Sequence, residues 1–324
     1  MSKGMLKPGG GAMQKALAFG SLLALVLIFS FLSENFRTIS NMINILQATS
    51  VIGVLAVSAT IIIITGGIDL SVGTAMTFTA VTAGMLLTWL GLPIPLGVMG
   101  AILIGALTGL ASGFFITKMR IPPFIATLGM MLVLKGLSLI FTGTKPIYFN
   151  DSPGFTDIAS GSIIESVVPA FPLPNGVIIL FAVAALIAWI LNRTALGRYT
   201  YAIGSNEEAT RLSGVNVDAW KMGIYALAGA VTGVAGILIA SRLNSAQPAL
   251  GQGYELEAIA AVVIGGTSLA GGRGTILGTI IGALIMSVLT NGLRILSVAP
   301  EWQIVATGFI IIGAVYADML RKKT

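Results

Sequence analysis

The chain has 324 residues, of which 56% are hydrophobic and only 9% are charged. Soluble domains carry roughly a quarter charged residues, so this composition excludes a soluble fold and indicates a membrane protein with several spans. The chain has no histidine, no cysteine and a net charge of +6. Disulfides, thiolate chemistry, imidazole-based metal sites and a Ser-His-Asp triad are therefore excluded, and no cofactor or metal is expected in this chain.

Long runs without charged residues locate the predicted spans of this all-α membrane protein. Charged side chains are costly in hydrocarbon, and a helix needs about 20 residues to cross it. The first run lacks a small-residue cleavage site after it, so it is predicted to be a retained span and not a signal peptide. The turn Gly91–Pro95 divides a long uncharged run into two segments. Ten helical segments are predicted: 16–33, 42–66, 70–91, 94–117, 122–143, 175–191, 222–241, 256–271, 274–293 and 302–320.

The basic residues predict the orientation of these segments. With the amino terminus in the cytoplasm, most of the 18 basic residues fall in inward-facing segments, while the outer loops collect acidic residues. Both termini are therefore predicted to be cytoplasmic, with a cytoplasmic segment 1–15, a single membrane domain 16–320 and a cytoplasmic tail 321–324. Nucleic-acid binding is not expected, because no basic stripe is interleaved with aromatic residues.

Two glycine-rich breaks interrupt the apolar pattern. The pattern Gly-Gly-x-x-Leu-x-x-Gly occurs at Gly66–Gly73 and again at Gly265–Gly272. Each break is either a tight turn at the membrane surface or the tip of a broken helix of the kind found in transporters. The similarity between the two breaks reflects either a tandem repeat of the two halves of the chain or chance. Glycines also recur every four residues in two series that predict close helix packing: Gly105, Gly109 and Gly113, and Gly274, Gly278 and Gly282.

The polar stretch 192–221 is predicted to be a cytoplasmic loop that carries a short helix, Asn206–Ser213. Ser205 and Glu208 fit a capping box, and Glu207 can pair with Arg211 four residues later. Gly214 suits the stop position of the helix. Ala209 and Leu212 form a small apolar face. A helix this short is marginal alone, so it either docks on a partner protein or lies on the inner face of its own chain.

Several stretches resemble a known family. Glu208-Ala209 followed by Gly214 resembles the Glu-Ala-Ala…Gly coupling loop of ABC importer permeases, although Thr210 replaces the second alanine. Thr65–Gly73, Ile121–Leu128 and Ser245–Gly272 resemble sugar permeases of the ribose/xylose/galactose type, closest to ribose permeases. The resemblance implies a subunit of an ATP-driven monosaccharide importer in the bacterial cytoplasmic membrane, with a second copy of itself, a cytoplasmic ATPase subunit and an extracytoplasmic sugar-binding protein as partners.

The chain is not expected to hydrolyse ATP itself. The nearest candidate for a phosphate-binding loop, Gly266–Arg273, lacks the terminal Lys-Ser/Thr. ATP and Mg²⁺ are therefore expected on the partner ATPase. A stand-alone secondary transporter is the alternative, but it would need ion-coupling carboxylates within the spans, and Asp69 is one of few. A membrane-embedded enzyme would lack catalytic groups.

Polar residues near the spans are candidates for the path of the solute. Asp69 either caps the helix that follows it or lines the path, and Lys135 either lines the path or extends its ammonium to the outer surface. The path or gate candidates are Gln47, Ser50, Asp69, Ser71 and Asn291. Four outward basic residues either dock the binding protein or anchor at the lipid headgroups: Arg37, Lys145, Arg242 and Arg294. The resemblance assigns sugar specificity mainly to the binding protein.

Overall fold

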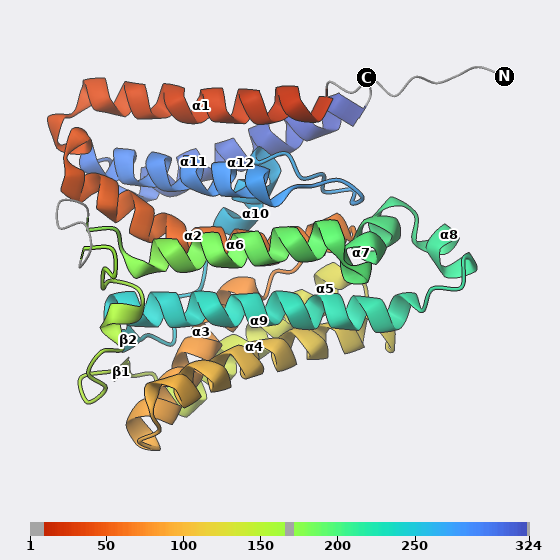
Figure 1. The fold of residues 1–324 in the computed structure, drawn as a ribbon, viewed down its shortest axis with the longest axis horizontal. Helices are drawn as coiled ribbons and strands as arrows, with labels where there is room; N and C mark the ends of the chain where they lie inside the picture. The colour runs from red at the N-terminus through yellow and green to blue at the C-terminus, as the bar shows by residue number, and fades with distance from the viewer. Residues whose placement is uncertain (1–9, 166–171, 323–324) are drawn as a thin grey trace.

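The computed structural model describes residues 10–165 and 172–322 as a bundle of helices (Figure 1). Its helices are α1 (Gly10–Leu32), α2 (Ile39–Ile64), α3 (Val72–Gly84), α4 (Ile94–Thr117), α5 (Pro123–Thr142), α6 (Asn175–Arg193), α7 (Ala195–Ser205), α8 (Glu207–Leu212), α9 (Val217–Leu243), α10 (Tyr254–Ile264), α11 (Ile276–Ile295) and α12 (Pro300–Lys322). Shorter turns are η1 (Glu34–Arg37), the π-helical η2 (Met85–Trp89) and η3 (Thr156–Ile158). The prediction of a helical membrane protein is confirmed.

A two-stranded ribbon is the other regular element. Strand β1 (Ile147–Tyr148) pairs antiparallel with β2 (Ser245–Ala246), so that Ile147 faces Ala246. The ribbon lies at one end of the bundle, and α8 projects from the opposite end (Figure 1). We call these the β-ribbon end and the α8 end.

Helices lie at the positions of all ten predicted segments. Within the described ranges, seven of them are long and apolar enough to cross a membrane. The number of complete crossings and the cytoplasmic location of the termini stay predictions. The ends predicted as 1–15 and 321–324 fall partly outside the described residues. The segment 256–271 is wrong in its second half, because α10 already ends at Ile264, where Gly266 adopts a φ of +92°.

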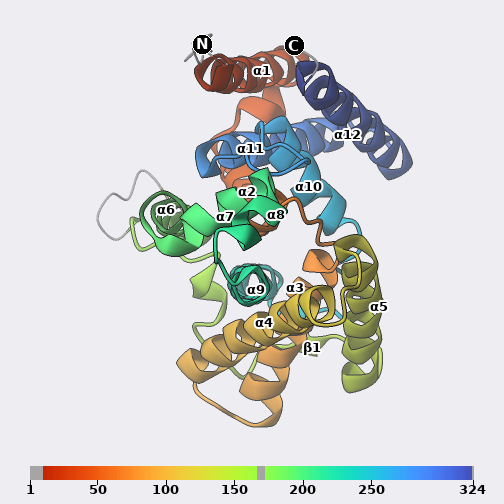
Figure 2. The ribbon, with the colours of Figure 1, turned by 90° about the vertical axis from the view of Figure 1, so that its right-hand side faces the viewer.

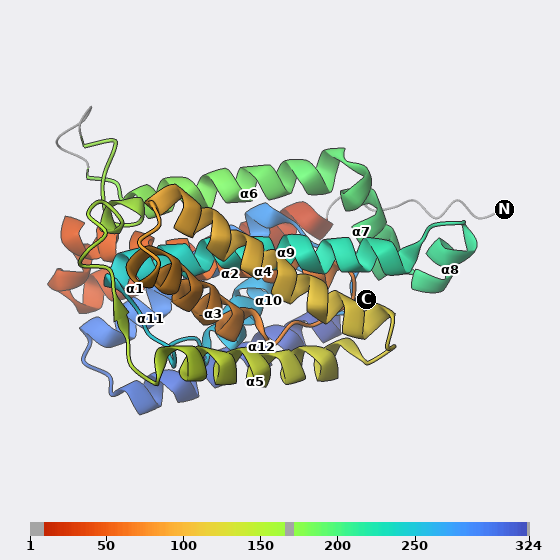
Figure 3. The ribbon, with the colours of Figure 1, turned by 90° about the horizontal axis from the view of Figure 1, so that it is seen from below.

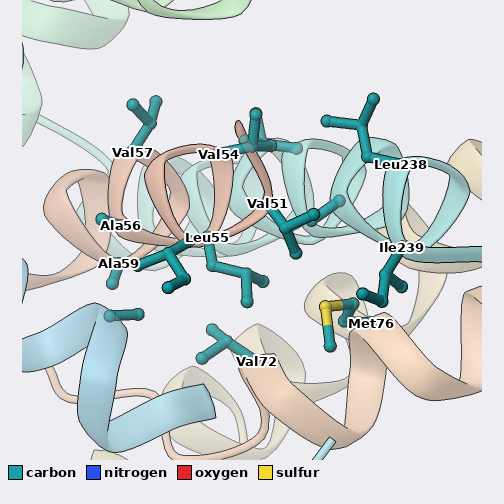
Figure 4. Close-up of a cluster of buried hydrophobic side chains, with 14 of the residues drawn as sticks. Val51, Val54, Leu55, Ala56, Val57, Ala59, Val72, Met76, Leu238 and Ile239 are labelled. Carbon is teal, nitrogen blue, oxygen red and sulfur yellow. The ribbon is translucent and has the colours of Figure 1, made fainter. Parts of the chain in front are cut away.

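Helix α2 forms the centre of the bundle (Figure 2). It is apolar on all sides, which is typical of a helix enclosed by others, and Leu55, Ile61 and Ile62 are fully buried. Leu55 faces Val72 and Met76 of α3 (Figure 4). The carbonyl of Ala228 in α9 accepts a hydrogen bond from the Ser58 hydroxyl at 2.7 Å. Helices α5 and α6 lie on opposite sides of this core (Figure 3).

Glycines allow close backbone contact between α4 and α9. A Cβ added to Gly105 would overlap the carbonyl oxygen of Gly229, and one added to Gly109 would overlap that of Tyr225. The first predicted glycine series therefore packs as expected. The second series is partly wrong: Gly278 and Gly282 pack on α10, but Gly274 precedes α11, whose N-cap is Thr275.

The first turns of α3 and α10 meet inside the bundle, and α3 continues directly into η2, so that Val72–Trp89 is long enough to cross a membrane. Helix α3 begins beside Leu55, about 14 Å before the end of α2 at a rise of about 1.5 Å per residue (Figure 4). Helix α10 has only 11 residues. A Cβ added to Gly73 would overlap the carbonyl oxygen of Gly251 and lie 2.5 Å from the carboxylate of Glu255. The choice between a surface turn and the tip of a broken helix stays a prediction for both breaks.

The two breaks share the geometry of a helix end, but their glycine motifs are one residue out of step. Gly66 donates to the carbonyl of Ile63 with a φ of +80°, and Gly266 donates to the carbonyl of Val263. The structural equivalent of Gly66 is thus Gly266, whereas the sequence motif aligns it with Gly265. Both breaks thus end a helix with a left-handed glycine, as many helices do, and this offset tests neither a tandem repeat nor chance.

We predict that Gly109→Ala destabilises the protein by about 1–3 kcal/mol, because the added methyl group forces α4 away from α9. Gly129→Ala on α5 is the matched control, since a Cβ there has no neighbour within 4 Å. Thermal unfolding in detergent measures both variants. Equal unfolding midpoints for the two variants would contradict direct backbone contact between α4 and α9.

Candidate functional site

Helix α8 carries the predicted coupling residues at the tip of the 192–221 loop. Its N-cap is Asn206, whose side-chain oxygen accepts from the amide of Ala209 at 2.9 Å. The predicted capping box is wrong, because Ser205 is the last residue of α7 and therefore lies within the preceding helix. Gly214 follows the helix with a φ of +83°, as the predicted stop requires.

Ion pairs connect α8 to the first turns of α9. Glu207 pairs with Arg211 at 3.3 Å, as predicted, and with Lys221 at 2.6 Å. Arg211 also reaches Asp218 at 3.0 Å. The hydrogen bond to Asp218 raises the pKa of Arg211, so this guanidinium stays charged at every physiological pH. Four charged side chains thus hold α8 in one orientation relative to α9.

The opposite face of α8 has no neighbour in the described part of the chain. Glu208 and Ala209 are exposed, and Leu212 is 83% exposed. Thr210, which departs from the coupling-loop pattern, is buried and donates to the carbonyl of Asn206 at 2.8 Å. An acidic and apolar surface beyond the ends of the other helices is available to a partner.

Helix α7 was missed by sequence reasoning. Thr194 caps it by accepting from the amide of Gly197 at 3.4 Å, and Tyr199 packs against Trp220 of α9 with ring centroids 4.8 Å apart. The Thr194 cap was a readable signal, but the polarity of the stretch concealed the helix. Helix α7 joins α6 to α8 without an intervening loop longer than one residue.

A polar groove lies where α3, α5 and the segment before α10 come together. The Lys135 ammonium of α5 donates to Gln252 Oε1 at 3.0 Å, beside the first turns of α3. Around these two side chains the groove holds only about 10 Å³, and an open hollow of about 410 Å³, which shares Pro248 and Ala249 with it, continues it towards the β-ribbon end. Sequence reasoning considered Lys135 but missed Gln252. The lining residues are Thr74, Thr77, Lys135, Leu139, Thr144, Pro146, Gln247, Pro248, Ala249, Leu250, Gly251 and Gln252.

The predicted path residues are not brought together. Asp69 is buried, and its Oδ1 accepts from the amide and the hydroxyl of Ser71 at 2.7 and 2.6 Å. This bonding stabilises the turn before α3. Ser50 donates to the backbone carbonyl of Gln47, near the other end of α2. The Asn291 amide donates to Asn41 at 2.9 Å and ties α11 to α2. None of these five residues lines the groove.

The four predicted docking residues all lie close to helix ends at the β-ribbon end. Arg37 is the last residue of η1 and pairs with Glu34 at 3.5 Å, and Lys145 lies in the loop that follows α5, where it is exposed. Arg242, in the last turn of α9, is half-buried, whereas Arg294 in α11 is exposed. Three of the four are thus accessible to a partner.

Comparison with known proteins finds sugar import permeases that match nearly the whole length of this chain. The ribose import permease protein of Escherichia coli strain K12 is 45% identical over 308 residues, which cover 94% of this chain and 93% of that protein. The ribose import permease protein of Bacillus subtilis strain 168 is 44% identical over 97% of this chain and 95% of its own length. The fructose import permease protein of Rhizobium meliloti is 36% identical over 93% and 84%. No solved structure matches the chain.

A family model also matches residues 41–315, which include most of α2, every helix from α3 to α11 and most of α12. Its description is that of the permease component of branched-chain amino acid transport systems. The match covers α3, α10, the groove and α8. The chain therefore belongs to this family of transport-system permease components.

Proposed function

We propose that this chain is the membrane-spanning subunit of an ATP-driven importer for ribose or a closely related monosaccharide. The observation that carries the proposal is the 45% identity to a ribose import permease over nearly the whole length of both proteins. The importer resides in the bacterial cytoplasmic membrane, with both termini and α8 on the cytoplasmic side. The positions of the basic residues support this orientation.

Helix α8 is the element that the ATPase subunit contacts. Its exposed face combines Glu208, Ala209 and Leu212, while its ion pairs to α9 resist displacement. Because this surface is accessible and ion-paired to α9, a displacement by the partner can pass from α8 to α9. ATP and Mg²⁺ bind that partner, because this chain lacks the Lys-Ser/Thr end of a phosphate-binding loop.

The groove is the part of the path that receives sugar from outside. Sugars present hydroxyl groups, which call for hydrogen-bonding partners such as the amide of Gln252, the ammonium of Lys135 and the Thr77 hydroxyl. The amino-terminal ends of α3 and α10 meet beside it, as the half-helices of many transporters do at their binding sites. The open hollow of about 410 Å³ beside these groups, lined by Leu139, Thr144 and Gln247 among others, is the approach to them from the β-ribbon end.

A second copy of the chain covers the open side of the groove. Lys135 lies within the predicted span 122–143, and a charged group at that depth is costly against lipid. A second copy closes the groove from the lipid and makes the path two-sided. The extracytoplasmic sugar-binding protein docks at the β-ribbon end, where Arg37, Lys145 and Arg294 supply accessible positive charge.

Reconstitution tests the function. The chain is purified in gentle detergent with the proteins that accompany it, which mass spectrometry identifies, and the complex is placed in liposomes with the binding protein. We expect a P-loop ATPase in the preparation and ribose uptake that requires ATP. Ribose uptake driven by an ion gradient, without any ATPase, would instead support the secondary transporter.

We predict that Glu208→Lys lowers co-purification of the ATPase at least about tenfold, because it reverses a charge at the centre of the exposed face. The ion pairs to α9 do not involve Glu208, so α8 keeps its orientation. Glu301→Lys, at an exposed position at the start of α12, is the control. Undiminished binding of the ATPase by Glu208→Lys would remove α8 from the interface.

We predict that Lys135→Met lowers ATP-dependent ribose uptake at least about tenfold, since a hydrogen bond to a charged group contributes about 1.5–3 kcal/mol. Methionine keeps the length of the side chain but removes its donors. Lys118→Met at the end of α4 is the control. Uptake is measured as initial rate against sugar concentration, and an unchanged rate in Lys135→Met would place the path elsewhere.

A further inference from the structure

Three segments that are distant in sequence meet at the α8 end by backbone contact. The amide of Gly272 donates to the carbonyl of Ile64 at 2.8 Å, which joins the break after α10 to the end of α2. Gly204 of α7 lies against this hydrogen bond: a Cβ there would overlap the Ile64 oxygen and lie 2.7 Å from the Gly272 nitrogen. A Cβ on Gly271 would lie 2.7 Å from the Gly204 oxygen and 2.8 Å from the Gly66 nitrogen.

One side chain reinforces this contact. The Tyr201 hydroxyl of α7 donates to the carbonyl of Gly274 at 2.9 Å, just before α11 begins. Helix α7 therefore contacts the segment between α10 and α11 at two points, Gly204 and Tyr201. The joint is defined here as the contact of Tyr201 and Gly204 with 64–66 and 271–274.

The joint is connected to α8 on one side and to the groove on the other. Asn206 is the single residue between α7 and α8, and it caps α8. Helix α10 runs from the groove, where Gln252 precedes it, to the break that enters the joint. A helix of 11 residues is a rod of about 16 Å, so a displacement at its last turn also displaces its first turn.

We propose that this joint transmits the movement of α8 through α10 to the groove. The proposal rests on the function proposed above, and it assigns Gly204 and Tyr201 as positioning residues that act on the groove without touching the sugar. Main-chain contact makes the transmission stiff, because no side-chain rotamer can absorb the displacement at Gly204. Helix α7, which was not predicted from the sequence, connects α8, the proposed ATPase contact, to the membrane domain.

The test compares Tyr201→Phe with Tyr199→Phe in the liposome-reconstituted complex. Both variants remove one hydroxyl from α7, but only Tyr201 donates to the joint, whereas the Tyr199 ring packs on Trp220. We expect Tyr201→Phe to lower ribose transported per ATP hydrolysed three- to tenfold, with the amount of assembled complex unchanged. Tyr199→Phe should stay within twofold of the wild type. Equal transport per ATP in the two variants would overturn the proposal.

Gly204→Ala provides the stronger perturbation, with Gly223→Ala in α9 as the control, because a Cβ at Gly223 meets nothing within 4 Å. The chain has no cysteine, so Ala249→Cys in the groove reports its accessibility to a thiol reagent with and without ATP. We expect the ATP-dependent change in labelling to disappear when Gly204→Ala is added and to persist with Gly223→Ala.

The possible failures are distinct. A labelling change that persists in assembled Gly204→Ala complexes would overturn the joint alone. Absence of any ATP-dependent change in the otherwise unaltered Ala249→Cys complex would overturn the role of the groove and the joint with it, whereas absence of ATP-dependent ribose uptake by the unaltered complex would overturn the proposed function. If Gly204→Ala prevents assembly of the complex, the Tyr201→Phe result decides whether the joint transmits movement, because Tyr201→Phe adds no atoms to the contact.

Discussion

Every backbone amide and carbonyl inside a membrane must find a partner within the protein. This requirement is hardest to meet in the two glycine-rich segments Gly66–Gly73 and Gly265–Gly272, because their backbone is not helical throughout. The structure meets it by letting the interruptions satisfy each other: Gly272 donates to Ile64, the last residue of α2. Such an approach needs residues without side chains on both sides, which explains why both interruptions are rich in glycine. Residues without side chains likewise allow the close approach of α3 and α10 at Gly73 and Gly251.

Much of the fold could be predicted from the sequence because its signals are local. Uncharged runs locate the helices, since the cost of a charge in hydrocarbon does not depend on which helices are neighbours. The short helix α8 could be predicted because residues that favour helix caps stand at both of its ends. The N-cap was placed one residue early because Ser205 and Asn206 cap equally well by residue type. Only the packing of α7, which includes Ser205 in its last turn, separates the two.

The groove could not be predicted in the same way. Lys135 and Gln252 belong to different helical regions, and only the tertiary fold brings them within 3.0 Å. Polarity alone was misleading for Ser50 and Asn291, whose hydrogen bonds are made inside the bundle to Gln47 and Asn41. In a membrane domain with few polar side chains, a polar residue serves helix association as readily as it serves a solute. The depth at which α3 begins likewise depends on contacts with α2.

The local caps of α8 give this chain a modular surface. Asn206 starts the helix and Gly214 ends it, and neither cap involves the membrane-embedded helices. The residues between them can therefore vary during evolution, or be transplanted from a relative, without a compensating change in the hydrophobic bundle. Divergence of the outward face, at Glu208, Ala209 and Leu212, can change the chemistry of this surface, while the Glu207–Lys221 pair preserves its geometry.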